Sequence, residues 1–304
     1  MGFFFHKKSD LSILGPIRIA YATLLLINVA TWWPQLNMWF GEQGVMTLQV
    51  SREAIDPDTI TIFQWLPTTS IVLWACYLLL IVNIVGLMVG LFTRCQLVCI
   101  FVLFTSFVHR NNLIFDGEDI VFRLMAFYLL LSPAGKYLSL DHRIASRRNP
   151  QPPKMYPIWP LRLIQIQTAA ILFFSGIEKL KGSNWIDGDA LYYVSRLDDL
   201  FYRLPVPEFV FESLLLMSLL TWATLFLELV IPIAIWFDKT RRVCLVILLA
   251  FHLSLDYSMN LNLFHWIMLV GWMSFIRPQD LKWLRKSNGN QRRQQLVNSS
   301  MGSS

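Results

Sequence analysis

Long apolar runs separated by short polar segments dominate the chain. Eight of these runs predict membrane-spanning helices, although some are shorter than the roughly 20 residues that a helix needs to cross a bilayer. The shortest are the fourth and the eighth, which leaves room for one re-entrant segment. The predicted spans are Ile13–Trp33, Ser70–Phe92, Arg94–Val108, Asp119–Leu131, Pro160–Ile177, Phe209–Trp236, Arg242–Tyr257 and Asn262–Phe275.

Three polar or mixed segments complete this plan. In residues 39–66, Ile55-Asp56-Pro57-Asp58 is a helix-start signal, and Ile60, Ile62, Phe63 and Leu66 would lay an apolar face on the membrane surface. Residues 147–153 are too rich in proline for a helix, so they predict a linker between two halves of four spans each. The polar residues 287–304 predict a disordered tail.

Composition restricts the class of protein. Of the 304 residues, 55% are hydrophobic and only 15% are charged, whereas a soluble domain carries about a quarter charged residues. With a mean hydropathy of +0.48, the chain is predicted to be an all-α, polytopic membrane protein. The net charge of +6 does not indicate nucleic-acid binding, because the basic residues collect in particular loops as cytoplasmic flanks do.

The distribution of charge between loops predicts the topology. Alternate loops are basic and acidic, so the positive-inside rule places both termini in the cytoplasm and requires an even number of spans. The basic loops surround Arg94, Lys136 to Lys154 and Lys239 to Arg242, and the basic tail follows Arg277. The acidic loops hold Glu42 to Asp58, Asp116 to Glu118 and Asp187 to Glu208.

Several classes of site have no sequence signal. The four cysteines lie in or beside apolar helices, which favours packing over disulfides, and Cys95 and Cys99 lack further ligands for a metal ion. A glycine-rich phosphate loop, a nucleophile elbow and a haem motif are also absent from the sequence. We therefore predict no metal site.

The segment Phe173–Trp185 holds the most informative polar residue. Lys179 lies at the outer end of a predicted span, where partial dehydration favours the neutral, basic amine. An interfacial lysine that extends its amine to water is the ordinary alternative. Trp185 and Asp187 follow in the outer loop as an interface anchor and a turn, and they are candidates for orienting a substrate.

Two further groups of polar residues are candidates for chemistry. At the start of the fourth span, Glu118 and Asp119 precede Arg123, which is one helical turn from Asp119 and can pair with it; helix capping is the alternative. In the seventh span His252 and Asp256 are also four residues apart, as in a general acid–base pair or a buried structural pair. The topology carries Asp119, Lys179 and Asp256 toward the outer leaflet, which predicts one pocket that opens outward.

These motifs resemble a known family. Gly176-Ile177-Glu178-Lys179-Leu180, then Asn184-Trp185 and Asp187-Gly188, resemble the lysine segment of vitamin K-dependent gamma-glutamyl carboxylase. They are closer still to bacterial proteins that carry the related horizontally transferred transmembrane (HTTM) domain. Asp116 to Asp119 with Arg123, and Tyr137-Leu138-Ser139-Leu140-Asp141, are similar to other hallmarks of that domain. The resemblance covers about Leu14 to Pro278.

The resemblance implies a chemistry. The carboxylase lysine, matched by Lys179, is a free amine that deprotonates a reduced quinone; oxygenation then gives a strong base that removes a glutamate γ-proton, and carbon dioxide traps the carbanion. The carboxylase histidine near the fourth span is replaced by Glu118 and Asp119, and a large lumenal region has no counterpart here. Carboxylation of glutamate itself is therefore not expected. Bacterial relatives include a membrane protein needed to mature a secreted peptide toxin.

Together these observations give one hypothesis and its rivals. Residues 1–278 would form a gamma-carboxylase-like enzyme of the bacterial inner membrane, with its active face outside the cytoplasm, and residues 279–304 a basic tail. Lys179, Asp119 and Glu118 would be catalytic, reduced quinone the cosubstrate and an exported peptide or small molecule the substrate. The alternative is a non-catalytic maturation factor for a secreted peptide. A small-solute transporter fits less well, since the sequence shows no inverted repeat.

Overall fold

The computed structural model describes residues 5, 7–47, 50, 51, 53, 61–67, 69–148, 155–197, 203, 204, 208–277 and 280. Among these residues the regular elements are helices, joined by turns and loops, and two short paired strands, β1 (Lys8–Ser9) and β2 (Tyr156–Pro157). A helix in each predicted span agrees with the all-α prediction. These helices are α2 (Leu14–Ala30), α5 (Ser70–Val89), α6 (Thr93–Arg110), α7 (Gly117–Leu131), α9 (Trp159–Lys179), α13 (Leu214–Ala234), α14 (Arg241–Ser258) and α15 (Phe264–Trp272).

The lengths and hydropathies of these helices establish a multi-pass membrane protein. Four segments among the described residues are both long and apolar enough to cross a bilayer: Leu14–Phe40, Ser70–Val89, Trp159–Lys179 and Leu214–Ala234. The other helices are shorter or carry more polar residues, because they enclose the buried polar groups described below. The total of eight spans and the cytoplasmic termini stay predictions.

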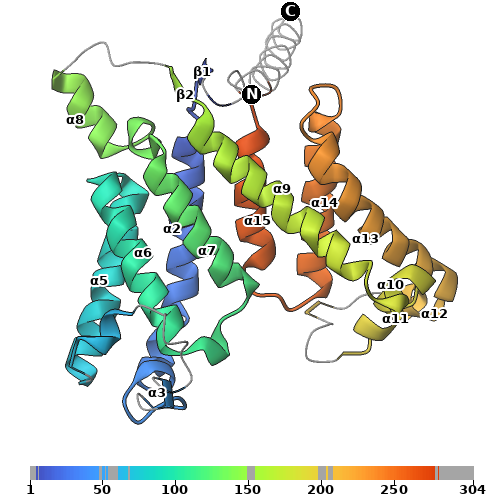
Figure 1. The fold of residues 1–304 in the computed structure, drawn as a ribbon, viewed down its shortest axis with the longest axis horizontal. Coiled ribbons are helices and arrows are strands. Elements are labelled where there is room, and N and C mark those ends of the chain that lie inside the picture. The colour runs from blue at the N-terminus through green and yellow to red at the C-terminus, as the bar shows by residue number, and fades with distance from the viewer. Residues whose placement is uncertain are drawn as a thin grey trace, which may run out of the picture.

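The first four long helices form one group. The central helix, α2, packs against α5, α7 and α15, and side chains such as Leu14, Ile17 and Leu25 are completely buried. Helix α6 packs between α5 and α7 (Figure 1). At the end of this group that holds α3 (Leu36–Phe40), the ring of Trp32 stacks on Phe104, with their centroids 5.8 Å apart.

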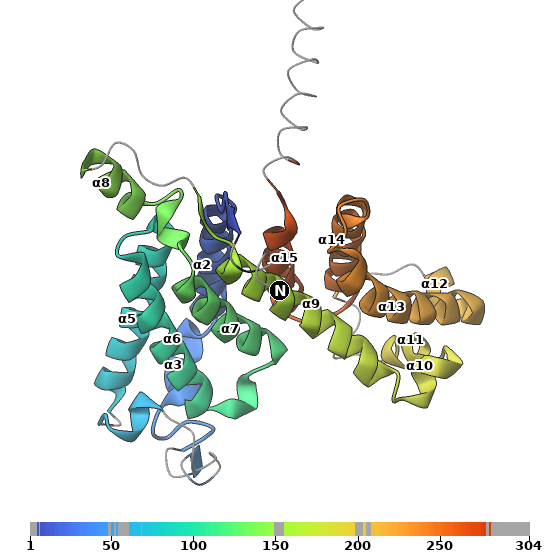
Figure 2. The same ribbon diagram turned by 45° about the horizontal axis from the view of Figure 1, so that its top comes forward.

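The second group is formed by α9, α13, α14 and α15. Helix α9 runs obliquely from β2 to the far end of the molecule, where it meets α10 (Ser183–Asp187) and α11 (Ala190–Val194) (Figures 1 and 2). Its principal partner is α13, which is preceded by α12 (Glu208–Glu212). Helix α15 contacts α2, α7 and α9, so it joins the two groups.

A helix that the sequence analysis did not predict follows α7. Helix α8 (Leu140–Arg148) includes the first two residues of the proposed linker, so that linker is shorter than expected. Its remaining residues lie outside the described part, as do Ile55 to Ile60 and residues 287–304. Of the predicted surface segment, Ile62, Phe63 and Leu66 are described. Phe63 is buried against Phe107, and Ile62 and Leu66 are partly buried against the same core, so these side chains pack inward.

The hallmark segment Tyr137–Asp141 forms a structural junction. Arg18, fully buried in α2, donates hydrogen bonds to the carbonyl oxygens of Ala134, Tyr137 and Leu138. The Asp141 carboxylate accepts hydrogen bonds from the backbone of Phe92 and Thr93 and thereby caps α6. These hallmark residues therefore have a structural role, because their hydrogen bonds hold α2, α6 and α8 together.

Gly90 is required in the same junction. It ends α5 with a φ of +76°, in the left-handed region that favours glycine. A Cβ atom at this position would lie 2.5 Å from Cβ of Ser139 and 2.6 Å from Nη1 of Arg18. A larger residue would therefore displace either the buried guanidinium or the segment that it holds.

Candidate functional site

Lys179 forms an ion pair across the interface between α9 and α13. Its Nζ lies 2.7 Å from both carboxylate oxygens of Glu228 in α13 and 2.7 Å from Oγ of Ser175, one turn earlier in α9. The Lys179 side chain is 24% exposed and that of Glu228 only 6%. Three acceptor oxygens therefore lie within hydrogen-bond distance of Nζ, as many as an ammonium group has donors.

The close approach of α9 and α13 depends on a glycine. A Cβ atom on Gly176 would lie 3.0 Å from Leu229 and 3.1 Å from Cβ of Glu228. Because small residues let membrane helices approach closely, Gly176 brings the carboxylate within reach of the amine. Gly176 therefore both allows α9 to pack against α13 and positions the ion pair.

The ring of Trp185 lies beside this pair. The ring of Trp185 in α10 has its centroid 5.2 Å from Nζ of Lys179, within the range of a cation–π interaction. Trp222 in α13 donates a hydrogen bond from Nε1 to the carbonyl oxygen of Ile186, which ties α10 to α13. Asp187 is exposed and ends α10, so it lies in the loop and not against the amine.

Glu118 and Asp119 lie in a different cluster. Oδ1 of Asp119 accepts a hydrogen bond from the Asn28 amide at 3.2 Å, and Oδ2 accepts one from the backbone N–H of Asp116 at 3.0 Å, as in a capping box. Buried Glu118 accepts hydrogen bonds from the backbone of Leu263 and Phe264. These acids thus cap the first turns of α7 and α15, the capping role that was the alternative interpretation.

Arg123 does not orient these acids as predicted. Its Nη1 lies 3.0 Å from Nε2 of His109 in α6, and among the described residues no ion pair joins it to Asp119. The spacing of four residues places the two side chains on one face of α7, where their charges interact without forming an ion pair. The guanidinium instead bridges α7 to α6.

The predicted pair of His252 and Asp256 does not form. His252 is buried; its Nδ1 lies 3.3 Å from Nδ1 of His265, and its Nε2 accepts a hydrogen bond from Nε1 of Trp272 at 3.0 Å. Asp256 binds Arg203 instead, at 2.5 Å. The two residues are one helical turn apart as predicted, but His265 and Trp272 of α15 are the partners of His252.

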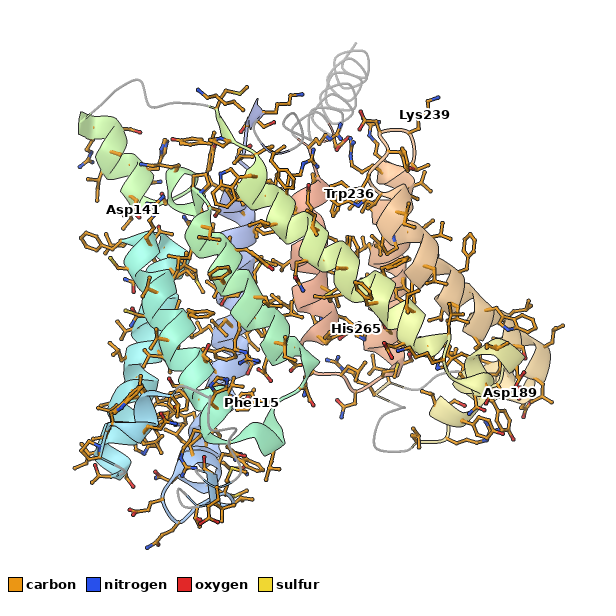
Figure 3. All side chains as sticks on the ribbon, viewed as in Figure 1. Phe115, Asp141, Asp189, Trp236, Lys239 and His265 are labelled. Carbon is orange, nitrogen blue, oxygen red and sulfur yellow. The ribbon has the colours of Figure 1, made fainter. Side chains whose placement is uncertain are left out.

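The candidate residues therefore occupy one half of the molecule without forming one cluster. The carboxyl ends of α9 and α14 and the amino end of α7 all lie away from β1 and from Lys239 (Figures 1 and 3). Lys179 pairs with Glu228, Asp119 with Asn28, and Asp256 with Arg203. The single pocket predicted to hold Asp119, Lys179 and Asp256 is replaced by three polar clusters.

Sequence reasoning missed Glu228. The signal was present, because a glutamate within the predicted span Phe209–Trp236 is costly unless it has a partner. It carried no recognisable motif and lies 49 residues from Lys179, so only the fold brings the two together. Among the described residues there is also no group of three or more His, Cys, Asp or Glu side chains that could hold a metal ion.

Comparisons with known proteins agree with this architecture. The family model for the HTTM domain matches residues 6–280. The chain is similar to the uncharacterized protein YitO of Bacillus subtilis (strain 168), with 24% identity over 216 residues that cover 68% of this chain and 67% of the relative. No solved structure shows a significant match. Since the match includes nearly all of the described helices, the chain belongs to the HTTM domain family.

Proposed function

We propose that this protein is a membrane enzyme related to gamma-carboxylase, in which Lys179 is the base and Glu228 its proton partner. The observation that carries the proposal is the contact of Nζ of Lys179 with both oxygens of a nearly buried carboxylate. An exported peptide or a small molecule would be the substrate, at the extracytoplasmic face of a bacterial inner membrane. In this proposal Glu228 is the acid partner of Lys179, a role that the sequence analysis gave to Glu118 and Asp119.

The proton would move along this contact. In the charged pair Lys179 is an ammonium and cannot accept a proton, so it must first transfer one from Nζ to a Glu228 oxygen. Removal of water when a substrate binds favours this transfer, because charged groups lose more hydration free energy than neutral ones do. The neutral amine that results is a base, and Ser175 Oγ holds it in place.

The surroundings of the amine fit a flat aromatic cosubstrate. Trp185 offers a ring face beside Nζ, and the 24% exposure of Lys179 leaves it accessible from the outer side of the pair. A reduced quinone would supply an acidic hydroxyl and reducing electrons there. Glu118, Asp119, Arg123, His252 and Asp256 stay candidates for positioning the substrate, through the helix ends that they hold.

Oxidation of a reduced quinone tests the proposal. The purified protein in lipid nanodiscs is given a reduced quinone and oxygen, and quinone formation is followed by absorbance. Lys179→Ala is expected to lower the rate by on the order of 10² to 10⁴, the contribution of a general base. Lys181→Ala is the matched control, because this lysine pairs with Glu178 in an exposed i,i+3 bridge. Equal rates for wild type and Lys179→Ala would refute the catalytic assignment.

The second candidate is a non-catalytic maturation factor for a secreted peptide. One observation favours it: every donor of the Lys179 ammonium is satisfied, as in a structural ion pair. In that case the outer loops would bind the peptide and the pair would only hold α9 to α13. A wild-type protein that never oxidises a quinone but supports maturation of an exported peptide would establish this function instead.

A further inference from the structure

A groove lies at the end of the molecule opposite the Lys179 pair. It has a volume of about 820 Å³ and is open on one side, within the range of roughly 300–1,000 Å³ typical of small-molecule sites. Its apolar wall comes from α2 and α5, with Ile13, Ile19, Met88 and Val89. The other wall is the segment from Lys136 to Arg143, which includes the hallmark residues that Arg18 and Asp141 fasten.

The polar wall of the groove is cationic. Lys136 and Arg143 are exposed, and their side chains make no ion pair or hydrogen bond with the described residues. Asp141 is the one acid between Lys136 and Arg147; its carboxylate is turned to Phe92 and Thr93, and the cations Lys136, Arg143 and Arg147 outnumber it. Arg147, one turn further along α8, is exposed on the same face as Arg143.

An apolar side chain is held outward beside these cations. Leu138 has a φ of +47°, in the left-handed region that residues with a Cβ rarely adopt. The fully buried Arg18 fixes this conformation through a 2.7 Å hydrogen bond from Nη2 to the Leu138 carbonyl oxygen. The Leu138 side chain is 65% exposed, and Ile144 of α8 is 46% exposed.

We propose that this groove binds an anionic glycerophospholipid of the membrane leaflet at this end. The phosphate would lie between Lys136 and Arg143, an acyl chain would lie against Ile19 and Met88, and Leu138 would enter the leaflet. Basic pockets beside apolar helices on the positively charged side of membrane proteins bind such headgroups. Asp10, beside Tyr137, and Asp141 are opposing charges nearby, and Lys7, Lys8, Lys136 and Arg143 outnumber them. The proposal does not depend on the chemistry of Lys179.

Lipid selectivity tests this site. The full chain, purified in detergent, is incubated with phosphatidylglycerol or phosphatidylcholine of identical acyl chains, and bound lipid is counted by native mass spectrometry. We expect phosphatidylglycerol to be preferred, and Lys136→Gln and Arg143→Gln each to weaken its binding about fivefold, since one interfacial cation contributes about 1 kcal/mol. The matched control is Lys239→Gln, which removes an exposed lysine at the same end of the molecule (Figure 3).

Three outcomes would overturn the proposal. The first is equal binding of the two lipids, and the second is unchanged binding in both groove variants. The third is displacement of the lipid by soluble glycerol 3-phosphate at equal concentration, which would assign a site for phosphate alone. Phosphatidylglycerol with a photoreactive acyl chain locates the site: labelling of residues 12–19 or 136–143 supports it, and labelling confined to residues 281–304 refutes it.

Discussion

At the scale of single residues, the ion pair between Lys179 and Glu228 decides how the site is understood. A lysine at the end of a membrane helix is ordinarily an anchor that reaches water. Here its Nζ turns instead to a carboxylate on the neighbouring helix, at 2.7 Å. The amine is therefore a positioned group, held by the carboxylate of Glu228.

Removing one partner should cost more stability than removing both. Glu228→Ala leaves an ammonium without its carboxylate, so we expect a loss of about 2 kcal/mol, below the 3–5 kcal/mol of fully buried pairs because Lys179 is partly exposed. The double variant Lys179→Met/Glu228→Ala should recover part of this loss. Thermal unfolding in detergent measures both. A double variant less stable than Glu228→Ala would contradict the assignment of an ion pair that matters to stability.

The sequence identified the lysine but not its carboxylate. Lys179, Trp185 and the turn after it were recognised from local motifs, and these residues do lie together. Glu228, Asn28 and His265 are partners that come from other helices, so their roles depended on tertiary contacts. Spacing on a helix shows which side chains share a face, but it does not show which neighbour that face meets.

At the scale of elements, the packing of α9 on α13 should depend on Gly176. Gly176→Ala places a Cβ atom 3.0 Å from Leu229 and 3.1 Å from Cβ of Glu228, so these neighbours must shift by a few tenths of an ångström. We expect a loss of about 1–3 kcal/mol, the usual cost of overpacking, measured by thermal unfolding. Gly182→Ala is the control, since its Cβ would meet Trp185 at an ordinary 3.4 Å. Equal stability of the two variants would argue against the close approach.

The junction around Asp141 gives a second prediction for elements. Asp141→Ala removes the acceptor for the backbone of Phe92 and Thr93 at the start of α6, so we expect a loss of about 1–2 kcal/mol, as for other N-terminal caps. Asp189→Ala is the control, because Asp189 is an exposed aspartate whose side chain makes no hydrogen bond with the described residues. If both variants melt at the wild-type temperature, the junction does not stabilise the fold.

The helices themselves were predictable from hydrophobic periodicity. Each of the eight apolar runs contains a helix, and the bounds of α14 differ from the predicted span by one residue at each end. Helix α8 was missed because its sequence is polar and ends beside proline. Its place in the fold comes from Ser139 and Asp141, whose side chains hold it to the turn before it and to α6.

At the scale of the whole molecule, the loop charges predict that the two ends lie on opposite sides of the membrane. Asp189 and Lys239 lie at opposite ends (Figure 3) and both are exposed. In a cysteine-free background, Asp189→Cys should react with a membrane-impermeant maleimide in intact cells. Lys239→Cys should react only after permeabilisation. The reverse pattern would place Lys179 on the cytoplasmic side and refute an extracytoplasmic active face.

The central claim is that Lys179 acts as a base and is not only a structural cation. Lys179→Arg tests it most directly, because a guanidinium preserves the ion pair with Glu228 but stays protonated. Melting temperature and the rate of quinone formation are measured on the same preparation. The account predicts a melting temperature near that of wild type with the rate lost, whereas a variant that keeps both would show that the amine never needs to give up its proton.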